Sequence, residues 1–240
     1  TNDVDIAIYE VGLGGRYDST NAWDHDAAIL TRIGLDHCHI LGDELTQIAD
    51  EKLPIAREGR PLFTTEAQEG IVLDHIRRHC AASKIPLFVA GIDGTRGADL
   101  DTAVPYAVSV AAGYERPSTF VDNARLALSV ASWVEPSMAP TITSQVLDRF
   151  RHPGRFEIVR REPWMILDGA HNPAAASALV EDLTSLAKQW FFVVALLKGH
   201  DAAGVLQALA PVASRMILTQ IDHPKAISAR DLAAVAPAGA

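Results

Sequence analysis

The stretch Asp5-Ile-Ala-Ile-Tyr-Glu10-Val-Gly-Leu-Gly-Gly-Arg16 organises the rest of the chain. Its apolar residues run from Ile6 to Val11, and a short apolar run that ends at a turn is typical of a buried strand in a covered sheet. In open α/β sheets, ligands lie beyond the carboxyl ends of the strands. We therefore expect the Glu10 carboxylate to lie beside a crevice.

Three glycines follow this predicted strand, at positions 12, 14 and 15. They allow a sharp turn and leave backbone amides that can face an anion. Their spacing does not match the dinucleotide fingerprint G-x-G-x-x-G, so a dinucleotide site is not indicated. A plain turn with a solvated Glu10 is the alternative interpretation.

Composition places the chain among ordinary globular proteins. It has 240 residues, 48% of them hydrophobic and 21% charged, which suffices for one large or two small domains. The net charge of −9 argues against a nucleic-acid or anionic-membrane surface. The two cysteines form neither a disulfide framework nor a metal-binding pair, and no apolar run reaches the length of a membrane span. We expect a cytoplasmic monomer.

Strand and helix patterns alternate along the chain, which predicts an α/β protein with a parallel, helix-covered sheet. In a first domain, residues 1–151, strands are expected at 27–33, 61–65 and 86–90 and helices at 44–56, 66–83, 120–134 and 142–150, with 91–105 irregular. Asp43 is the expected N-cap of the helix at 44–56. Pro54 should end or kink that helix near Lys52 or Leu53. The segment His152-Pro-Gly-Arg155 contains turn-forming Pro and Gly, and it is the expected start of a second domain, residues 152–240. In this domain we expect strands at 156–160, 164–167, 190–197 and 216–221 and helices at 173–188, 201–213 and 228–236.

Two groups of polar residues suggest chemistry. Glu10, His37 and Lys52 can be gathered near one crevice, but a carboxylate and an imidazole alone make a weak Mg²⁺ site. Lys52 would join such a site only as a carbamate, which replaces its positive charge. A turn or cap role for His37 and a solvated helix face for Lys52 are the alternatives.

Asp168 and His171 form a second group, between the apolar strand at 164–167 and a helix that begins at Pro173. The helix N-terminus and both side chains would face the same space, where phosphate or carboxylate binding is chemically sensible. An Asp that caps the helix and a loop histidine are the alternative.

Six motifs occur together in this chain: Glu10-Val-Gly-Leu-Gly-Gly-Arg16, Asp18-Ser-Thr-Asn21, Ile33-Gly-Leu-Asp-His37, Glu51-Lys52, Pro153-Gly-Arg155 and Leu167-Asp-Gly-Ala-His-Asn-Pro173. In this order they resemble the folylpolyglutamate and dihydrofolate synthase family of the Mur ligase superfamily. The resemblance implies a partial Mur-ligase-like ATPase domain followed by a partial Rossmann-like ligase domain. It also implies an ATP-dependent ligase that joins L-glutamate to a folate or dihydropteroate carboxyl group through an acyl phosphate.

The resemblance also implies roles for individual residues. Glu10 and His37 would hold Mg²⁺, and Lys52 would be the carbamylated lysine of a second metal site. Asn123 would contact adenine and Arg155 would contact ATP at the domain hinge. Asp168 and His171 would face the nucleotide or the incoming glutamate.

Departures from the family pattern leave alternatives open. None of the five lysines precedes Ser or Thr, so the family's phosphate loop is absent from these residues. We therefore expect this chain alone to be inactive, as an internal piece of a ligase. A non-catalytic binding or regulatory paralogue and a Mur-like ligase for another carboxylic acid are the other hypotheses.

Overall fold

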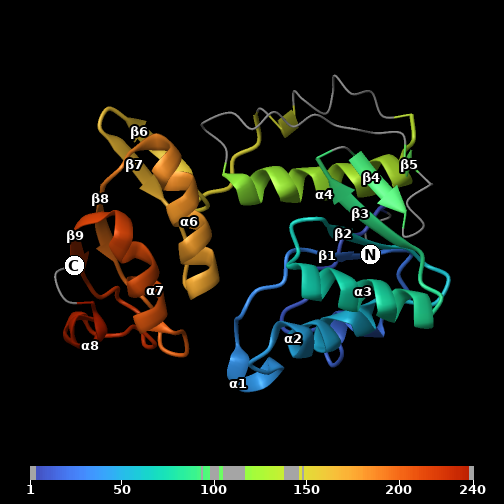
Figure 1. Ribbon diagram of the computed structural model, residues 1–240, viewed down its shortest axis with the longest axis horizontal. Coiled ribbons are helices and arrows are strands. Elements are labelled where there is room, and N and C mark those ends of the chain that lie inside the picture. Colours follow the sequence, from blue (N-terminus) through green and yellow to red (C-terminus); the bar gives the residue numbers. More distant parts are fainter. Residues whose placement is uncertain are drawn as a thin grey trace. The chain divides into compact units, whose positions relative to one another are not determined.

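The computed structural model describes residues 4–92, 94–97, 103–104, 117–137, 146–147 and 149–237 (Figure 1). The chain divides into two compact units that do not follow a single cut in the sequence. The first unit comprises Thr1–Ile33, Cys38–Ser109 and Arg125–Ser137, and the second comprises Gly34–His37, Val110–Ala124 and Met138–Ala240.

The first unit contains a five-stranded sheet in the order β1-β2-β3-β4-β5. Its strands are β1 (Ala28–Leu30), β2 (Leu62–Thr65), β3 (Leu87–Gly91), β4 (Gly94–Gly97) and β5 (Ala103–Val104). The first three pair in parallel, with Ala28 opposite Leu62 and Leu62 opposite Leu87, which confirms the predicted parallel sheet. The expectation of an irregular segment at 91–105 is wrong for its described part, because β4 pairs antiparallel with β3 and β5 pairs antiparallel with β4. Gly94 has φ +106, a left-handed conformation that glycine adopts without strain.

Helices pack on this sheet through side chains spaced by one turn. The elements are α1 (Cys38–Leu41), α2 (Leu45–Lys52), α3 (Gly70–Ala82), α4 (Ser118–Val134) and the 3₁₀ turns η1 (Ser19–Ala22) and η2 (Leu53–Ile55). In α3, Val72, Ile76 and Cys80 are spaced four residues apart and are fully buried, whereas Ile71 is exposed. They join Leu62 in a core that also takes in Ile48 of α2. The helical spacing read from the sequence is therefore confirmed for α3.

Helix α2 ends where Pro54 requires it to end. Its last residue is Lys52, and Pro54 lies in the first turn of η2, where its missing N–H costs nothing. The prediction of Asp43 as the N-cap is wrong by one residue, since Glu44 is the N-cap. The Gln47 side chain accepts hydrogen bonds from the backbone amides of both Asp43 and Glu44, and this contact sets the start of the helix.

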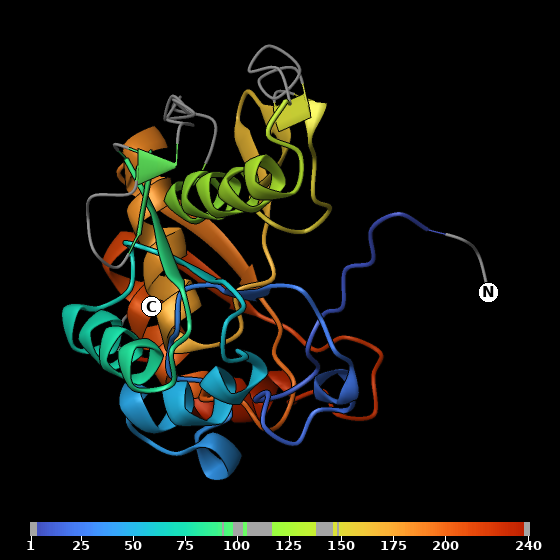
Figure 2. The ribbon, with the colours of Figure 1, turned by 90° about the vertical axis from the view of Figure 1, so that its right-hand side faces the viewer.

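The strand expected at residues 5–11 is absent. The described residues from Val4 to Glu10 are exposed and belong to no strand, and Figure 2 shows the dark-blue start of the chain running away from the rest of its unit. A strand is held by hydrogen bonds to a neighbour, and among the described residues this segment has no paired strand. Its apolar side chains remain exposed, Ile8 at 87%.

Between residues 150 and 237, all of which the structure describes, the second unit contains two strand pairs and three α-helices. The elements are β6 (Glu157–Arg161), β7 (Trp164–Leu167), α6 (Pro173–Leu186), β8 (Trp190–Val194), α7 (Ala202–Leu209), η3 (Ala210–Val212), β9 (Ala213–Leu218) and α8 (Ala229–Val235). Strands β6 and β7 form an antiparallel hairpin, and β8 pairs with β9 in parallel across the intervening α7. Leu206 of α7 and Leu232 of α8 are fully buried in the core of this unit.

The strand β8 is covered on one face only. Phe192 and Val194 pack on the core, whereas Phe191 and Val193 are exposed at 53% and 66%. The expectation of a buried strand is therefore wrong for two of its five side chains. The helix expected at 142–150 lies largely outside the described residues.

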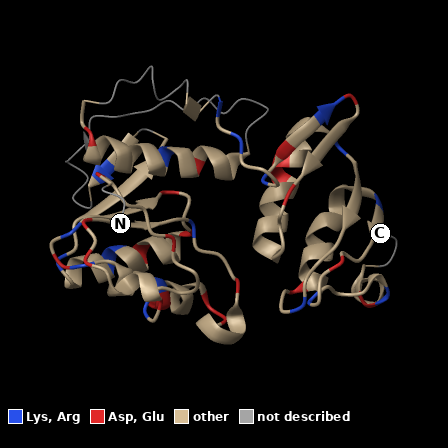
Figure 3. Cartoon of the chain, turned by 180° about the vertical axis from the view of Figure 1, so that it is seen from behind, with Lys and Arg blue, Asp and Glu red and all other residues tan. Residues whose placement is uncertain are grey.

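Charged side chains of both signs are interspersed over the described elements (Figure 3). In the first unit they pair across neighbouring segments, as in Arg16 with Glu51 and Arg60 with Asp24. None of the described helices has the length and apolar content needed to span a bilayer.

Candidate functional site

The glycine-rich loop of the first unit is fixed to the end of α2. The Arg16 amide donates to the Glu51 carbonyl at 2.9 Å, and the Arg16 guanidinium donates to the Asp50 carbonyl and to the Glu51 carboxylate. A Cβ on Gly15 would lie 2.9 Å from the Lys52 carbonyl oxygen, which explains the glycine at that position. The loop therefore covers the carboxyl end of the helix that carries Lys52.

The amides of this loop are occupied by the protein itself. Gly12 and Leu13 donate their amides to the Asp18 carboxylate, at 2.9 and 3.3 Å, so the expectation that the glycine turn leaves amides for an external anion is wrong for these positions. Thr20 adds its hydroxyl and amide to the same carboxylate. The Thr20 hydroxyl, followed by the amides, lowers the pKa of Asp18 to about 2. Asp18 thus takes the place of a bound anion in the loop.

The three residues expected to hold magnesium are divided between the two units. Glu10 and Lys52 belong to the first unit, and His37 belongs to the second. Glu10 is exposed and lies outside any strand, and Lys52 is the partly exposed last residue of α2. His37 is half-buried, with a left-handed φ of 50°. The magnesium site therefore stays a prediction.

In the second unit, Asp168 connects two loops. Its carboxylate accepts a hydrogen bond from the Phe156 amide at 2.7 Å and from the Ala170 amide at 2.8 Å. The exposed Arg155 precedes Phe156, and its guanidinium lies against Gly169, where a Cβ would come within 2.7 Å. The loop expected to face nucleotide or glutamate is therefore built by Asp168 with Arg155 held beside it.

Helix α6 begins as the sequence predicted, with Pro173 in its first turn. The capping residue is Asn172, whose side-chain oxygen accepts from the Ala175 amide at 2.8 Å, and not Asp168. The amide nitrogen of the Asn172 side chain donates to the Asp36 carboxylate at 3.0 Å. Asn172 thereby joins the start of α6 to the segment Gly34–His37.

Three side chains of the second unit gather beside this contact: Asp36, His171 and His200. Asp36 and His200 were not among the residues singled out from the sequence. Both follow a strand, Asp36 after β1 and His200 after β8, so the signal that pointed to His37 and Asp168 was present for them as well.

The protonation of this group reflects its packing. Burial works against ionisation of Asp36, but the hydrogen bonds from Asn172 and the His37 amide and the nearby histidines lower the pKa of its carboxyl overall. Burial, followed by the neighbouring His171, lowers the pKa of His200 and favours its neutral form. Both shifts favour the carboxylate form of Asp36 and the neutral form of His200.

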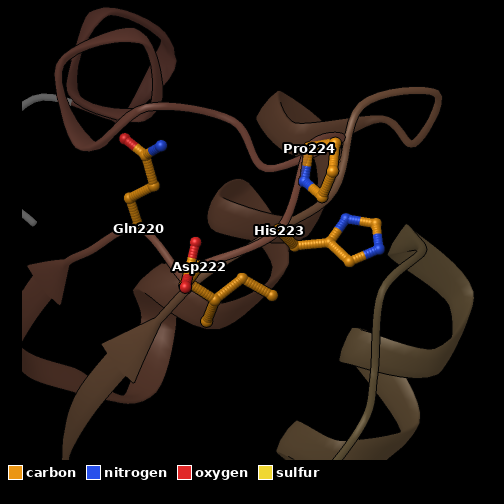
Figure 4. A pocket seen from close by; sticks show the side chains of 5 residues that line it. Gln220, Asp222, His223 and Pro224 are labelled. Carbon is orange, nitrogen blue, oxygen red and sulfur yellow. The ribbon is translucent and has the colours of Figure 1, made fainter.

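The remaining predicted residue, Asn123, is exposed on α4. A pocket elsewhere in the second unit follows β9 and is lined by residues 220–224. In Figure 4 the side chains of Gln220 and His223 extend in different directions, and none of the residues predicted from the sequence lines this pocket. The group around Asp36 and the Asp168 loop are therefore the candidate site, because the groups that can carry chemistry converge there.

Comparison with known proteins shows what the chain is similar to. A family model described as the glutamate ligase domain of Mur ligases matches residues 154–240. The dihydrofolate synthase/folylpolyglutamate synthase of Escherichia coli (strain K12) is 32% identical over 237 residues, which cover 95% of this chain and 54% of that protein. The corresponding Bacillus subtilis (strain 168) protein is 29% identical over 252 residues, covering 95% of this chain and 56% of the relative. The chain is a relative of folylpolyglutamate and dihydrofolate synthases.

Solved structures of these synthases agree with the fold. The Mycobacterium tuberculosis folylpolyglutamate synthase complexed with ADP superposes with a TM-score of 0.78 at 26% identity, covering 97% of this chain and 55% of that chain. A bifunctional synthase with Mn, AMPPNP and L-glutamate bound gives a TM-score of 0.75 at 29% identity, covering 95% and 55%. The predicted resemblance to these synthases and the predicted α/β fold class are thus confirmed.

The chain spans about half the length of the synthases that it matches. The part matched by the glutamate ligase model contains Arg155, Asp168, His171 and His200. Three residues of the candidate site that were predicted from the sequence, Arg155, Asp168 and His171, therefore lie in the part matched by the glutamate ligase model.

Proposed function

We propose that the protein to which this chain belongs is an ATP-dependent ligase that adds L-glutamate to a folate or dihydropteroate carboxyl group. The observation that carries the proposal is similarity along 95% of the chain to dihydrofolate synthase/folylpolyglutamate synthases. Related structures contain AMPPNP, Mn and L-glutamate in one case and DHPP and ADP in another. These ligands are a nucleotide, a divalent metal ion, the amino acid and an acid acceptor, which is the full set that such a ligation needs.

The reaction consists of two group transfers. A carboxylate oxygen of the acceptor attacks the γ-phosphorus of ATP, and ADP leaves. The glutamate nitrogen then attacks the acyl carbon, inorganic phosphate leaves with the C–O bond electrons, and the amine loses a proton to give the amide. Such transfers depend on positioning and on neutralisation of the phosphoryl charge.

Residues of the ligase part are arranged to bind charged groups. Arg155 offers a guanidinium, which can bind a carboxylate or phosphate with two parallel hydrogen bonds. Asp168 fixes the backbone just after this arginine through its bond to Phe156, and its own loop through its bond to Ala170. We assign Asp168 a positioning role, and Arg155 and His171 direct contact with the glutamate or nucleotide.

The magnesium assignment rests on donor chemistry. The exposed Glu10 carboxylate suits Mg²⁺, which prefers oxygen ligands and keeps several waters. An ammonium group on Lys52 does not suit a cation, whereas a carbamate on the same nitrogen supplies two oxygens. We propose Glu10, His37 and Lys52 as the holders of the ion, which when bound neutralises phosphate charge. We also propose that Asn123 contacts adenine. The protein is proposed to be a monomer of the cytoplasm.

The test is glutamate incorporation by a protein in which this chain is joined to a phosphate loop. We expect ATP-dependent transfer of labelled L-glutamate to dihydropteroate or a folate. Asp168→Asn should lower kcat/KM by about 100-fold, because a small displacement of positioning residues costs rates of that order. The matched control, Glu181→Gln on the exposed face of α6, should leave kcat/KM unchanged.

Two outcomes would contradict this proposal. Transfer of glutamate to neither pterin acceptor, but to another carboxylic acid, would replace the substrate class. Binding of nucleotide without any transfer would favour a non-catalytic paralogue. An Asp168→Asn variant with full activity would remove Asp168 from the machinery.

A further inference from the structure

Three side chains from distant parts of the sequence lie within metal-ligand distance in the second unit. Asp36, His171 and His200 each offer one ligand atom, and these atoms lie within 4.8 Å of one another. All three residues are half-buried. Two imidazoles and one carboxylate are the ligand types that zinc and related transition metals use in proteins.

The contacts of His171 point one ring nitrogen at the other two residues. Its Nδ1 lies 2.9 Å from the Gly169 carbonyl oxygen, which can only accept, so Nδ1 carries the hydrogen. In the neutral ring, Nε2 then carries a lone pair. This nitrogen lies 3.5 Å from the Asp36 carboxylate. This separation exceeds the usual range of a hydrogen bond, about 2.7–3.2 Å. Two lone pairs that face each other at this distance repel unless a proton or a metal ion lies between them.

The carboxylate of Asp36 is oriented before any ion binds. One oxygen accepts from the His37 amide at 2.8 Å, and the other accepts from the Asn172 side chain at 3.0 Å. Hydrogen bonds of this kind from outer residues commonly fix the ligands of a metal. The backbone carbonyl behind His171 has the same role for the imidazole.

His200 contributes an independent observation. Its Nδ1 is buried and has no hydrogen-bond partner among the described residues. Its ring packs against that of His171, with centroids 4.6 Å apart. A buried polar atom without a partner is costly and uncommon in a folded protein, and an ion bound to the ring is a way to account for it.

We propose that Asp36, His171 and His200 bind one divalent transition-metal ion of the zinc class, with a fourth position for water. Ligands of a tetrahedral zinc ion lie about 3.3 Å apart, given bonds near 2.0–2.1 Å. The 3.5 Å between His171 and Asp36 fits this value, and the ligand atom of His200 lies within 4.8 Å of the other two. The site differs from the proposed magnesium site in its residues and in its preference for imidazole. It shares His171 with the proposed ligase site, but it does not require ligase activity.

The experiment is titration of the untagged chain with Co²⁺ and Zn²⁺. We expect one Co²⁺ per chain with the intense visible absorption of a tetrahedral ion, displaced by an equivalent of Zn²⁺. Asp36→Asn, His171→Ala and His200→Ala should each weaken binding by at least about 100-fold, and more than the loss of an outer residue does. Asn172→Ser keeps a helix-capping side chain and loses the amide that holds Asp36, so it should weaken binding by about 10- to 100-fold.

The control is His223→Gln, which removes a histidine of the same unit from outside the group. It should leave the affinity unchanged. Circular dichroism of each variant shows whether it is folded, and His200→Gln serves if His200→Ala is not. Octahedral Co²⁺ spectra, binding that survives the loss of either histidine in a folded variant, or equal weakening by His223→Gln would overturn the proposal. Because the readout is metal binding, its failure is distinct from failure of the ligase assay.

Discussion

At the scale of single residues, Asp18 shows how the glycine-rich loop is stabilised. Its carboxylate accepts hydrogen bonds from the amides of Gly12, Leu13 and Thr20 and from the Thr20 hydroxyl. Because these donors favour the charged form, the pKa falls from 3.8 to about 2. The resulting stabilisation is fully present above the unfolded-state pKa, near 4, and is lost as the pH falls through the folded-state value.

Thr20→Val removes the hydroxyl and keeps the branched shape. We expect the pKa of Asp18 to rise towards its ordinary value, because the hydroxyl is the largest cause of the shift. Carboxyl ¹³C NMR over the acid range measures this directly, and the pH dependence of unfolding between pH 5 and 2 should become shallower. Thr20→Ser retains the hydroxyl and should retain the low pKa. An unchanged pKa in the valine variant would show that the amides alone set it.

At the scale of elements, α3 illustrates how a periodic pattern becomes a buried helix face. Ile76 is fully buried and Ile71 is 62% exposed, although both are isoleucines of the same helix. The difference follows from their angular positions, since Val72, Ile76 and Cys80 share the face that meets the sheet.

Ile76→Ala should lower the free energy of unfolding by about 2–5 kcal/mol, because it removes buried carbons and leaves a cavity. Ile71→Ala should change it by no more than about 0.5 kcal/mol. Urea denaturation followed by circular dichroism measures both. Equal effects of the two substitutions would mean that the assigned face of α3 is wrong.

At the scale of the whole molecule, the 240 residues contain ligase features but no Lys-Ser or Lys-Thr pair. The backbone amides and lysine of a phosphate loop cradle the β- and γ-phosphates of ATP. We therefore expect the purified chain to release no ADP in a reaction coupled to glutamate ligation. A coupled enzyme assay for ADP, with and without dihydropteroate, measures this. Turnover that depends on the acceptor would show that other residues bind the phosphates.

Much of the secondary structure could be predicted from local pattern. Strands β1, β2 and β3 and helices α3, α4 and α6 lie where apolar spacing and proline placed them, within a few residues at their ends. These elements depend on side chains that are close in the sequence, so short-range periodicity carries the information. Asp168 and His171 were singled out by the same kind of local signal, polar residues at the end of a strand, and their roles stay predictions.

The sequence by itself determined the resemblance to the synthases, the α/β class and the order of the helices and parallel strands, since motifs and periodicity are properties of neighbouring residues. Only the tertiary structure decided that residues 5–11 form no strand, because pairing needs a partner from elsewhere in the chain. It also decided that Asp18 occupies the loop amides and that Asp36 and His200 join His171. Such groups arise from folding of distant segments, which the spacing along the chain does not encode.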